Sequence, residues 1–258
     1  MPQTKNVFFD IDGTLIDMQA KKITPKMLET LHRLQDRGIK ICIATGRSPM
    51  VLPKIDGVAF DAYLTFNGSL CYDRKGVIFS NPIPHKDVVR FIQNAAALGL
   101  PVCVSTRDRL AANGTDTDLT DYFFIANEPV PVADDFDAVC AEDIYQLMLG
   151  CRPKDYPALL DGAPGAKIAA WWDRAVDVIP AGGGKGIGIE KMLAYYGLDK
   201  AEALAFGDGN NDREMLQAVG TGVAMENGSP ELKAIADEIC GPVYEDGSYH
   251  YCADKGLI

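Results

Sequence analysis

The chain has 258 residues, 47% of them hydrophobic and 24% charged, which suits one large domain or a core domain carrying a second. Its formal net charge is -11 and its 25 Lys and Arg residues are scattered, which argues against a nucleic-acid partner. Apolar runs are too short to cross a bilayer and no signal peptide is indicated, so we expect no membrane association. Seven widely spaced cysteines predict buried thiols in a reducing compartment, and hence a cytoplasmic location.

An apolar run near the start of the chain, Val7 to Phe9, leads directly into two acidic residues. Such a run predicts a strand that is buried on both faces. Asp10 and Asp12 stand two residues apart, so in extended backbone both side chains point to the same side. Neighbouring carboxylates repel unless a cation lies between them or one of them holds a proton. The pair therefore indicates a metal, a shared proton or both, while an ordinary turn at Gly13 stays open as the alternative.

The elements that follow alternate between helix and strand. Thr24-Pro25 predicts a helix start and Gly38 its end, because a capping hydroxyl precedes a proline and a glycine closes the run. This alternation predicts an α/β fold with a doubly wound, Rossmann-like parallel sheet. We expect strands over Ile39 to Ala44, Ala62 to Phe66, Ala203 to Phe206 and Thr221 to Met225, and helices over Pro49 to Ile55, Lys185 to Tyr196, from Met215 and from Ser229-Pro230.

After Asn67 the pattern changes to that of an inserted domain. Two short apolar runs around a turn, Ser69 to Tyr72 and Val77 to Ser80, predict an antiparallel hairpin. A block of mixed helices and strands follows, so we expect an α+β insertion at residues 83–180 between core segments 1–82 and 181–258. The sequence does not place the polar segment Arg107–Asp121. Within the insertion we expect helices over Val88 to Leu98, Asp134 to Ala141 and Asp155 to Leu160, and strands over Pro101 to Thr106, Ile144 to Cys151, Lys167 to Trp172 and Val176 to Ile179.

Further polar clusters stand where predicted strands end. They are Thr45-Gly46-Arg47, Asn67-Gly68, and the run from Gly207 to Asp212. In open α/β sheets the carboxyl ends of the strands form the ligand-binding edge. A calcium loop from Asp208 is excluded, because the turn glycine and the bidentate glutamate that it needs are both missing.

A glycine-rich segment, residues 182–186, precedes another predicted helix. Its spacing fits neither the phosphate loop nor the dinucleotide fingerprint. Lys185 falls in the first turn of the helix, where a cation is disfavoured by the positive end of the helix dipole. An anionic partner for Lys185 is thus the alternative to an ordinary solvated lysine.

Taken in order, these clusters resemble the four motifs of the haloacid dehalogenase superfamily of phosphotransferases. The motifs are Asp10-Ile-Asp12-Gly-Thr14, Thr45-Gly-Arg47, Lys185, and Gly207-Asp208 with Asn211-Asp212. Each is weak alone, but the ordered set spans nearly the whole chain. The insertion after the third strand is similar to the large α/β cap of the Cof-type, sugar-phosphatase-like branch. The resemblance implies that this cap sets substrate specificity.

The resemblance also implies roles for individual residues. Asp10 would be the nucleophile that becomes an aspartyl phosphate, and Asp12 would act as the acid and then the base. Thr45 and Lys185 would stabilise the transferring phosphoryl group. For Arg47 and Asn67, a surface arginine and an ordinary turn stay open as alternatives. The implied Mg²⁺ ligands are Asp10, Asp12 through its backbone carbonyl, Asp208 and Asp212, and the implied substrate-binding residues are Thr45, Gly46, Arg47, Asn67, Lys185 and Asn211.

The resulting hypothesis is a magnesium-dependent phosphatase of small phosphorylated metabolites, either sugar phosphates or a phosphorylated cofactor. A phosphomannomutase-like sugar phosphomutase is the first alternative, although the predicted cap is sparse in the arginines and lysines that a mutase prefers. A non-catalytic phospholigand-binding regulator is the second, although a pure binder needs no Asp10 and Asp12 pair. We expect a monomer or a weak homodimer. The sequence does not identify the metabolite.

Overall fold

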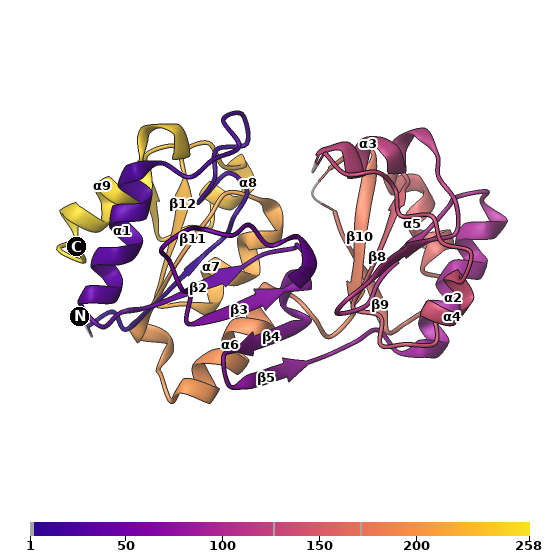
Figure 1. The fold of residues 1–258 in the computed structure, drawn as a ribbon, viewed down its shortest axis with the longest axis horizontal. Helices are drawn as coiled ribbons and strands as arrows, with labels where there is room; N and C mark the ends of the chain where they lie inside the picture. Colours follow the sequence, from indigo (N-terminus) through magenta and orange to yellow (C-terminus); the bar gives the residue numbers. More distant parts are fainter. Residues whose placement is uncertain (1–2, 126, 171) are drawn as a thin grey trace. The chain divides into compact units, whose positions relative to one another are not determined.

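The computed structural model describes residues 3–125, 127–170 and 172–258, which form two compact units (Figure 1). The core unit contains the described residues up to Arg47 together with Pro53–Ser80 and Gly184–Ile258. The inserted unit contains Ser48–Leu52 and the described residues of 81–183. Within the described residues, no helix has both the length and the apolar character that crossing a membrane requires.

The core unit is built on an eight-stranded sheet with the order β13-β12-β11-β1-β2-β3-β4-β5. Its first six strands are parallel, and the β3–β4 and β4–β5 pairs are antiparallel. The predicted α/β fold with a doubly wound parallel sheet is therefore confirmed. The strands are β1 (Asn6–Phe9), β2 (Lys40–Ala44), β3 (Ala62–Thr65), β4 (Leu70–Asp73), β5 (Gly76–Ser80), β11 (Ala203–Gly207), β12 (Thr221–Met225) and β13 (Glu238–Cys240).

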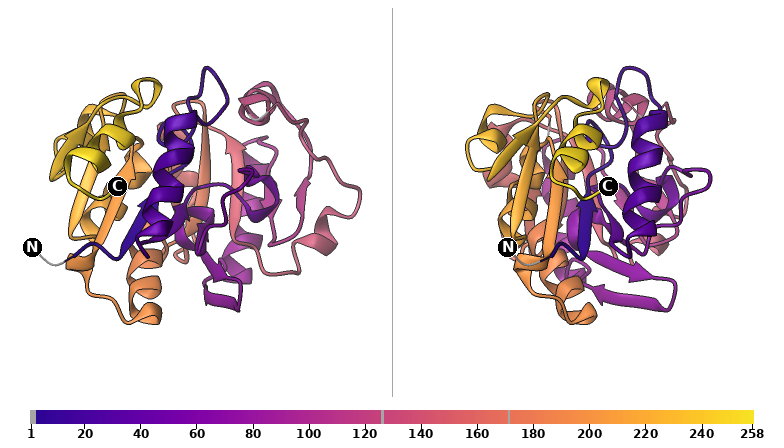
Figure 2. Two further views of the ribbon diagram at one scale, coloured as in Figure 1. Left: turned by 60° about the vertical axis from the view of Figure 1, so that its left-hand side comes forward. Right: turned by 90° about the vertical axis from the view of Figure 1, so that its left-hand side faces the viewer.

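Helices cover both faces of the core sheet because its strands are apolar on both sides. One face, which includes Phe8, packs against α6 (Lys185–Tyr196), α7 (Arg213–Ala218) and α8 (Pro230–Lys233). On the other face Phe9 stacks on Phe206, with ring centroids 5.2 Å apart, and Tyr251 of α9 meets Phe206 edge-on. Figure 2 shows α1 (Pro25–Asp36) beside the carboxyl-terminal α9 (Gly247–Asp254). The 3-10 turns of the core unit are η2 (Phe66–Gly68), η4 (Lys200–Glu202), η5 (Asn210–Asp212) and η6 (Val243–Glu245).

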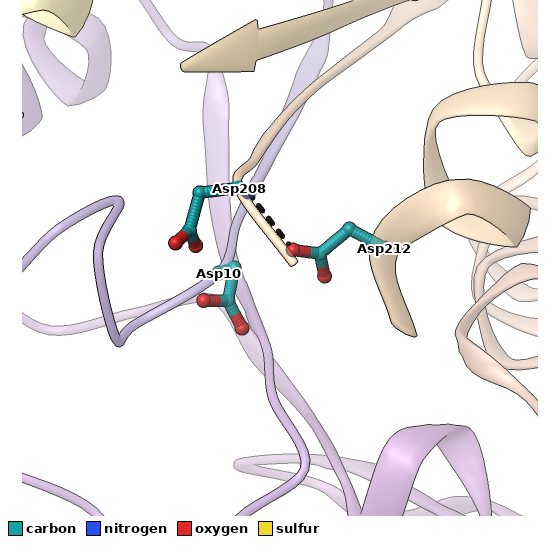
Figure 3. Close-up of side chains that lie close together, drawn as sticks. All are labelled: Asp10, Asp208 and Asp212. Atoms are coloured by element: carbon teal, nitrogen blue, oxygen red, sulfur yellow. Dashed lines mark hydrogen bonds between the residues drawn. The ribbon is translucent and has the colours of Figure 1, made fainter. Parts of the chain in front are cut away.

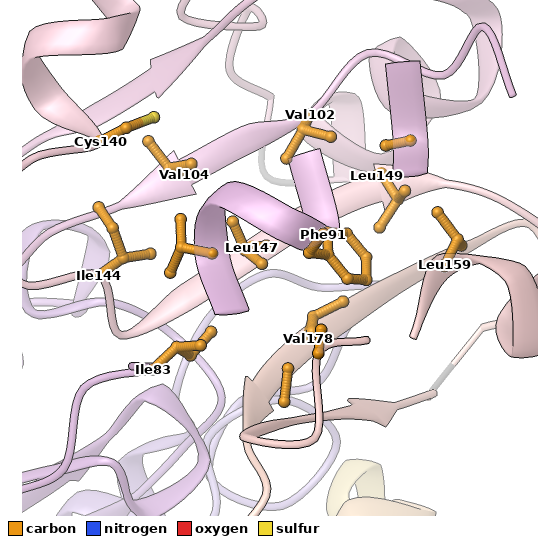
Figure 4. Packing of buried hydrophobic residues seen from close by; sticks show 14 of the residues in the cluster. Ile83, Phe91, Val102, Val104, Cys140, Ile144, Leu147, Leu149, Leu159 and Val178 are labelled. Atoms are coloured by element: carbon orange, nitrogen blue, oxygen red, sulfur yellow. The ribbon is translucent and has the colours of Figure 1, made fainter. Parts of the chain in front are cut away.

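The inserted unit is built on a five-stranded antiparallel sheet with the order β7-β6-β8-β10-β9. One face carries a continuous apolar core in which Phe91 of α2 packs with Leu147 and Val178 of the sheet (Figure 4). The other face packs against α3 through Leu119 and Phe123. The elements are α2 (His85–Ala97), β6 (Cys103–Ser105), β7 (Leu110–Ala112), α3 (Thr117–Ile125), α4 (Phe136–Val139), β8 (Gln146–Gly150), η3 (Pro153–Asp155), α5 (Tyr156–Leu159), β9 (Ala166–Ala169) and β10 (Ala175–Pro180), and Ser48–Leu52 contributes η1 (Pro49–Val51).

The helix caps predicted from the sequence are confirmed. The hydroxyl of Thr24 accepts the backbone N–H of Met27 at 3.1 Å, and Ser229 Oγ accepts that of Leu232 at 3.2 Å. Gly38, which follows α1, has φ 73°, and its N–H donates to the Gln35 carbonyl at 2.8 Å. Each cap satisfies a backbone group that the helix itself leaves unpaired.

In four segments the structure differs from the sequence analysis or adds to it. The helix expected over Pro49 to Ile55 is only the turn η1, because Leu52 is extended and precedes a proline, which disfavours helical backbone. The unplaced segment after Arg107 forms β7 and the start of α3, whose first turn is capped by Asp116 Oδ1 at 2.7 Å from the Leu119 nitrogen. The carboxyl-terminal tail, for which the sequence analysis predicts no helix, carries α9. The predicted strand from Lys167 ends at Ala169, and Trp171 in its expected continuation lies outside the described residues.

Candidate active site

The loop after β1 is shaped by a tight turn and a glycine. Asp10 N–H still donates to the Phe206 carbonyl at 3.0 Å, and the Ile11 carbonyl then accepts the N–H of Leu15 at 3.0 Å. Gly13 has φ +86°, and a Cβ at this position would lie 2.2 Å from Asp208 Oδ2. Only glycine combines this backbone conformation with room for the Asp208 carboxylate. The turn therefore lets the loop after β1 lie directly against Asp208, at the end of the neighbouring strand β11.

Lys185 is a buried cation between two carboxylates. Its side chain has no exposed surface, and Nζ lies 2.7 Å from Asp10 Oδ1 and 2.5 Å from Asp212 Oδ1. Burial lowers the pKa of Lys185, but the charges of Asp10 and Asp212 outweigh it and hold the pKa above its ordinary value. The lysine is thus charged and held in place, which excludes the solvated alternative.

Three carboxylates meet beside this lysine. Oxygens of Asp10, Asp208 and Asp212 all lie within 4.8 Å of one another (Figure 3). Asp212 Oδ2 also accepts the backbone N–H of Asp208 at 3.0 Å and that of Gly209 at 2.9 Å. Thr14 Oγ1 donates to Asp208 Oδ1 at 3.2 Å. Backbone and side chain together fix the positions of all three acids.

The carboxylate cluster carries more negative charge than Lys185 can neutralise. Burial raises the pKa of Asp10 well above its ordinary value, and the neighbouring aspartates add to this against the opposing charge of Lys185. Burial, followed by the charge of Asp212, raises the pKa of Asp208 to about 7. A divalent cation would relieve this repulsion, and Mg²⁺ prefers oxygen ligands of this kind. The donor set therefore fits magnesium.

The Asp12 side chain lies outside this cluster and pairs with Arg47. Arg47 Nε donates to Asp12 Oδ2 at 2.8 Å, and Nη2 donates to Oδ1 at 2.6 Å. This two-point geometry is the strong form of an arginine–carboxylate interaction. Arg47 is therefore bound to an acidic residue of the first motif, and its contact with substrate stays a prediction.

The remaining predicted residues lie at the ends of β2, β3 and β11. Thr45 is buried, and its Oγ1 accepts the Arg47 N–H at 3.1 Å. Asn211 Nδ2 donates to Asn67 Oδ1 at 3.0 Å, and a Cβ on Gly46 would lie 3.1 Å from Asn67 Nδ2. All the predicted site residues thus gather in the core unit. Their contacts with substrate and metal stay predictions.

Two residues that the sequence analysis did not select also contact the site. Asn227 Nδ2 donates to the Gly13 carbonyl at 2.8 Å, while its Oδ1 accepts the Val243 N–H at 2.9 Å. Glu214 Oε2 would lie 1.9 Å from a Cβ on Gly184, so its carboxylate rests against the backbone that enters α6. Asn227 follows the end of β12, and this position after a strand is the sequence feature that could have identified it as a site residue.

Comparison with known proteins identifies the family. Residues 7–251 match the haloacid dehalogenase-like hydrolases. The chain belongs to this family. It is 34% identical to the putative phosphatase YkrA of Bacillus subtilis over 257 residues, which cover 99% of both chains. It is also 28% identical to the 5-amino-6-(5-phospho-D-ribitylamino)uracil phosphatase YitU of the same organism, over 93% of each chain.

A solved structure agrees with the sequence relatives. The subclass IIB sugar phosphatase BT4131 superposes with a TM-score of 0.88 at 28% identity, over 99% of this chain and all of that one. The predicted membership of the Cof-type, sugar-phosphatase-like branch is thereby confirmed. The chain is a phosphatase of the haloacid dehalogenase type.

Proposed function

We propose that this enzyme is a magnesium-dependent phosphatase that hydrolyses small phosphorylated metabolites through an aspartyl phosphate on Asp10. The observation that carries the proposal is the buried Lys185, held between Asp10 and Asp212 with Asp208 alongside. A nucleophilic carboxylate beside a fixed cation suits phosphoryl transfer, where positioning and charge stabilisation supply most of the catalysis.

In the first step a carboxylate oxygen of Asp10 attacks phosphorus and the bond to the leaving oxygen breaks. Asp12, which must open one of its two hydrogen bonds with Arg47 to hold a proton, donates that proton to the leaving oxygen, so the metabolite leaves as an alcohol. In the second step Asp12 takes a proton from water, whose oxygen attacks phosphorus. The acyl phosphate bond breaks, and inorganic phosphate and the free carboxylate of Asp10 are formed.

The other polar residues hold the phosphoryl group and the ion. Lys185 offsets the charge of Asp10 and of the phosphoryl oxygens, and Thr45 donates a hydrogen bond to one of them. Asp10, Asp208, Asp212 and the backbone carbonyl of Asp12 would hold Mg²⁺. When bound, this ion supplies positive charge that draws phosphate and nucleophile together. Gly46, Arg47 and Asn211 complete the proposed substrate-binding set, and Asn67 supports it through its hydrogen bond with Asn211.

The inserted unit favours a phosphatase over the phosphomutase alternative. A mutase must rebind a phosphorylated intermediate and needs basic groups for it. Each of the five arginines of residues 81–183 has a carboxylate partner within this same unit. Arg109, for example, binds Asp135 through two hydrogen bonds of 2.7 and 2.5 Å. We therefore propose the insertion, residues 83–180, as a cap that selects the metabolite.

The substrates of the relatives support the proposed substrate class. YitU acts on a phosphorylated ribitylaminouracil and BT4131 is a sugar phosphatase. Both names describe phosphate monoesters of small polyol-like or sugar-like molecules. We propose the same class for this enzyme, and we place it in the cytoplasm because all seven cysteines are free and buried.

The test is phosphate release from a panel of sugar phosphates and phosphorylated cofactor precursors, with Mg²⁺ and with EDTA. The proposal expects turnover that needs Mg²⁺ and that disappears in folded Asp10→Asn. Isomerisation of a sugar phosphate without phosphate release would establish the mutase alternative. Tight binding of a phosphorylated ligand with neither reaction would establish the regulator. Turnover that survives in Asp10→Asn would refute the aspartyl phosphate.

A further inference from the structure

Three consecutive residues after β3 adopt the left-handed backbone conformation. Phe66 and Asn67 each have φ 51°, and Gly68 has φ 92°. The Phe66 side chain is fully buried, and a bulky residue in this region is a genuine conformational outlier. Such strain persists only where the surroundings hold it, and it concentrates at functional sites. The connection between β3 and β4 does not by itself account for the backbone strain in η2.

The backbone of η2 holds the second motif in place. Phe66 N–H donates to the Arg47 carbonyl at 3.0 Å, and Asn67 N–H donates to the Thr45 carbonyl at 3.0 Å. Thr45 N–H in turn donates to the carbonyl of Leu64 at 2.9 Å. The loop that carries Thr45 and Arg47 is thus bonded to the turn at both of these residues.

The same turn contacts the third and fourth motifs. A Cβ on Gly68 would lie 2.3 Å from the Gly184 carbonyl oxygen and 3.2 Å from the Cα of Lys185, so the turn packs directly against the start of α6. The side chain of Asn67 accepts a hydrogen bond from Asn211 Nδ2 at 3.0 Å. Asn67 itself is buried. One strained turn therefore contacts the segments that carry Thr45, Lys185 and Asn211.

We infer that Asn67 is a positioning residue that acts through Asn211. Asparagine tolerates the left-handed conformation better than other residues with a side chain, and its amide oxygen reaches Asn211 from there. With its Nδ2 engaged by Asn67, the Asn211 amide has one fixed orientation at the carboxyl end of β11. The inference rests on the proposed function only in that Asn211 lies among the groups that bind the phosphoryl substrate.

Three variants separate the side chain of Asn67 from its backbone. Asn67→Gly keeps the left-handed conformation and removes the amide, whereas Asn67→Asp keeps an acceptor oxygen on the same stem. Asn127→Gly is the matched control, because Asn127 also has a positive φ, of 59°, and lies in the inserted unit. Urea unfolding midpoints for all three variants exclude a general loss of structure.

The first measurement needs no substrate. In ¹H–¹⁵N spectra the side-chain NH₂ pair of Asn211 is identified by its loss in Asn211→Asp. The inference expects this pair to shift in Asn67→Gly and to stay near its wild-type position in Asn67→Asp and Asn127→Gly. An unchanged pair in Asn67→Gly would overturn the inference, whether or not the enzyme proves to be a phosphatase.

The second measurement is a double-mutant cycle on kcat/KM for phosphate release. We expect Asn67→Gly and Asn211→Ala each to lower kcat/KM about tenfold, which is typical of groups that orient site residues. If Asn67 acts through Asn211, the double variant is no worse than Asn211→Ala. Losses that multiply in the double variant would refute this. Asp10→Asn tests the proposed function separately.

Discussion

Arg47 and Asp12 form a two-point ion pair in which Nε lies 2.8 Å from Oδ2 and Nη2 lies 2.6 Å from Oδ1. The two side chains are about one third exposed, at 30% and 33%. A carboxylate held at both oxygens has one orientation rather than several. Arg47 therefore fixes the direction in which the proposed acid and base of the reaction points.

The pairing of Arg47 with Asp12 predicts how the loss of activity in Arg47→Ala depends on the leaving group of the substrate. An alkyl phosphate needs a proton on its leaving oxygen, whereas p-nitrophenyl phosphate does not, because nitrophenolate leaves without help. We expect kcat/KM to fall about tenfold or more for the alkyl phosphate and clearly less for the aryl one, since general acid catalysis contributes about 10²–10⁴-fold. Steady-state kinetics on both substrates measure this difference.

Two further variants complete the Arg47 experiment. Arg47→Lys is expected to recover only part of the activity, because one ammonium cannot make both contacts. Arg33→Ala removes an arginine whose Nη1 lies 3.2 Å from Glu29 Oε1 on α1, and should leave both rates unchanged. Equal losses on the two substrates in Arg47→Ala would show that Arg47 does not act through Asp12.

The buried Lys185 makes a strong prediction about stability. Lys185→Met leaves Asp10 and Asp212 buried without their cation. We expect the free energy of unfolding to fall by about 3–5 kcal/mol, as for other broken buried ion pairs. Urea denaturation at pH 7 in EDTA measures the change. Adding Asp212→Asn to Lys185→Met should recover part of it, because one of the two unpaired charges is then gone.

The exposed Lys26 gives the control for this experiment. Its Nζ lies 3.7 Å from Asp246 Oδ2, and its side chain is 48% exposed. Because surface pairs contribute little, Lys26→Met should change the free energy of unfolding by less than about 1 kcal/mol. An equally small effect of Lys185→Met would contradict the picture of a cation clamped between two buried acids.

Magnesium binding should distinguish Asp208 from Asp12. The Asp208 carboxylate belongs to the three-acid cluster, whereas the Asp12 side chain is bound by Arg47 and contributes only its backbone carbonyl in the proposed site. We expect Asp208→Asn to weaken Mg²⁺ binding at least about tenfold, because a charged oxygen ligand is lost. Asp12→Asn should bind Mg²⁺ nearly as wild type yet lose turnover. Calorimetric titration checks both, and comparable losses in the two variants would contradict the assignment.

The sequence was informative where chemistry and local structure coincide. The carboxyl ends of parallel strands share one edge of a sheet, so polar residues after β1, β2, β3 and β11 could be placed together from their positions alone. The caps at Thr24 and Ser229 were also predictable, because a capping hydroxyl directly before a proline favours the start of a helix.

The sequence was uninformative where a contact joins distant positions or where packing overrides local preference. Arg47 and Asp12 are 35 positions apart, and no local pattern pairs them. Phe66 has no sequence signal for its left-handed conformation, because the surrounding structure imposes it. The helix α3 was missed since its polar start resembles a loop. Its stability comes from packing Leu119 and Phe123 on the sheet of the inserted unit.

The close approach of Gly68 to α6 predicts a large effect of Gly68→Ala. The new methyl group would lie 2.3 Å from the Gly184 carbonyl oxygen at a residue with φ +92°. We expect a loss of about 2–5 kcal/mol in the free energy of unfolding, since a left-handed alanine costs about 1–2 kcal/mol and overpacking about 1–3 kcal/mol. Gly38→Ala is the control, with φ +73° and nothing within 4 Å of its Cβ position. In Gly38→Ala the free energy of unfolding should fall only by the cost of the left-handed backbone. Equal losses in the two variants would show that the contact of Gly68 with Gly184 is unimportant.

An ion cluster in the inserted unit predicts how stability depends on pH. Asp118 Oδ1 accepts hydrogen bonds from Arg174 Nε at 3.0 Å and Nη2 at 2.7 Å, and Oδ2 lies 2.8 Å from Arg152 Nη1. The hydrogen bond from Arg152 lowers the pKa of Asp118 most, and that from Arg174 adds to it against the opposing effect of burial. Because the folded pKa lies below the unfolded one, this stabilisation is complete above the unfolded pKa and is lost as the pH falls through the folded pKa.

The variant Asp118→Asn tests whether stability is lost in this direction, as the pH falls. We expect the variant to be about 1 kcal/mol less stable than wild type at pH 7, because this ion cluster is largely exposed. The difference should narrow below about pH 4 and vanish below the folded pKa, where the carboxyl is protonated in both folded and unfolded chains. Urea denaturation at a series of pH values measures it. Asp161→Asn, which breaks an exposed pair with Arg90, should change stability little at any pH. If the difference in the free energy of unfolding between wild type and Asp118→Asn stays constant with pH, charge at Asp118 does not stabilise the fold.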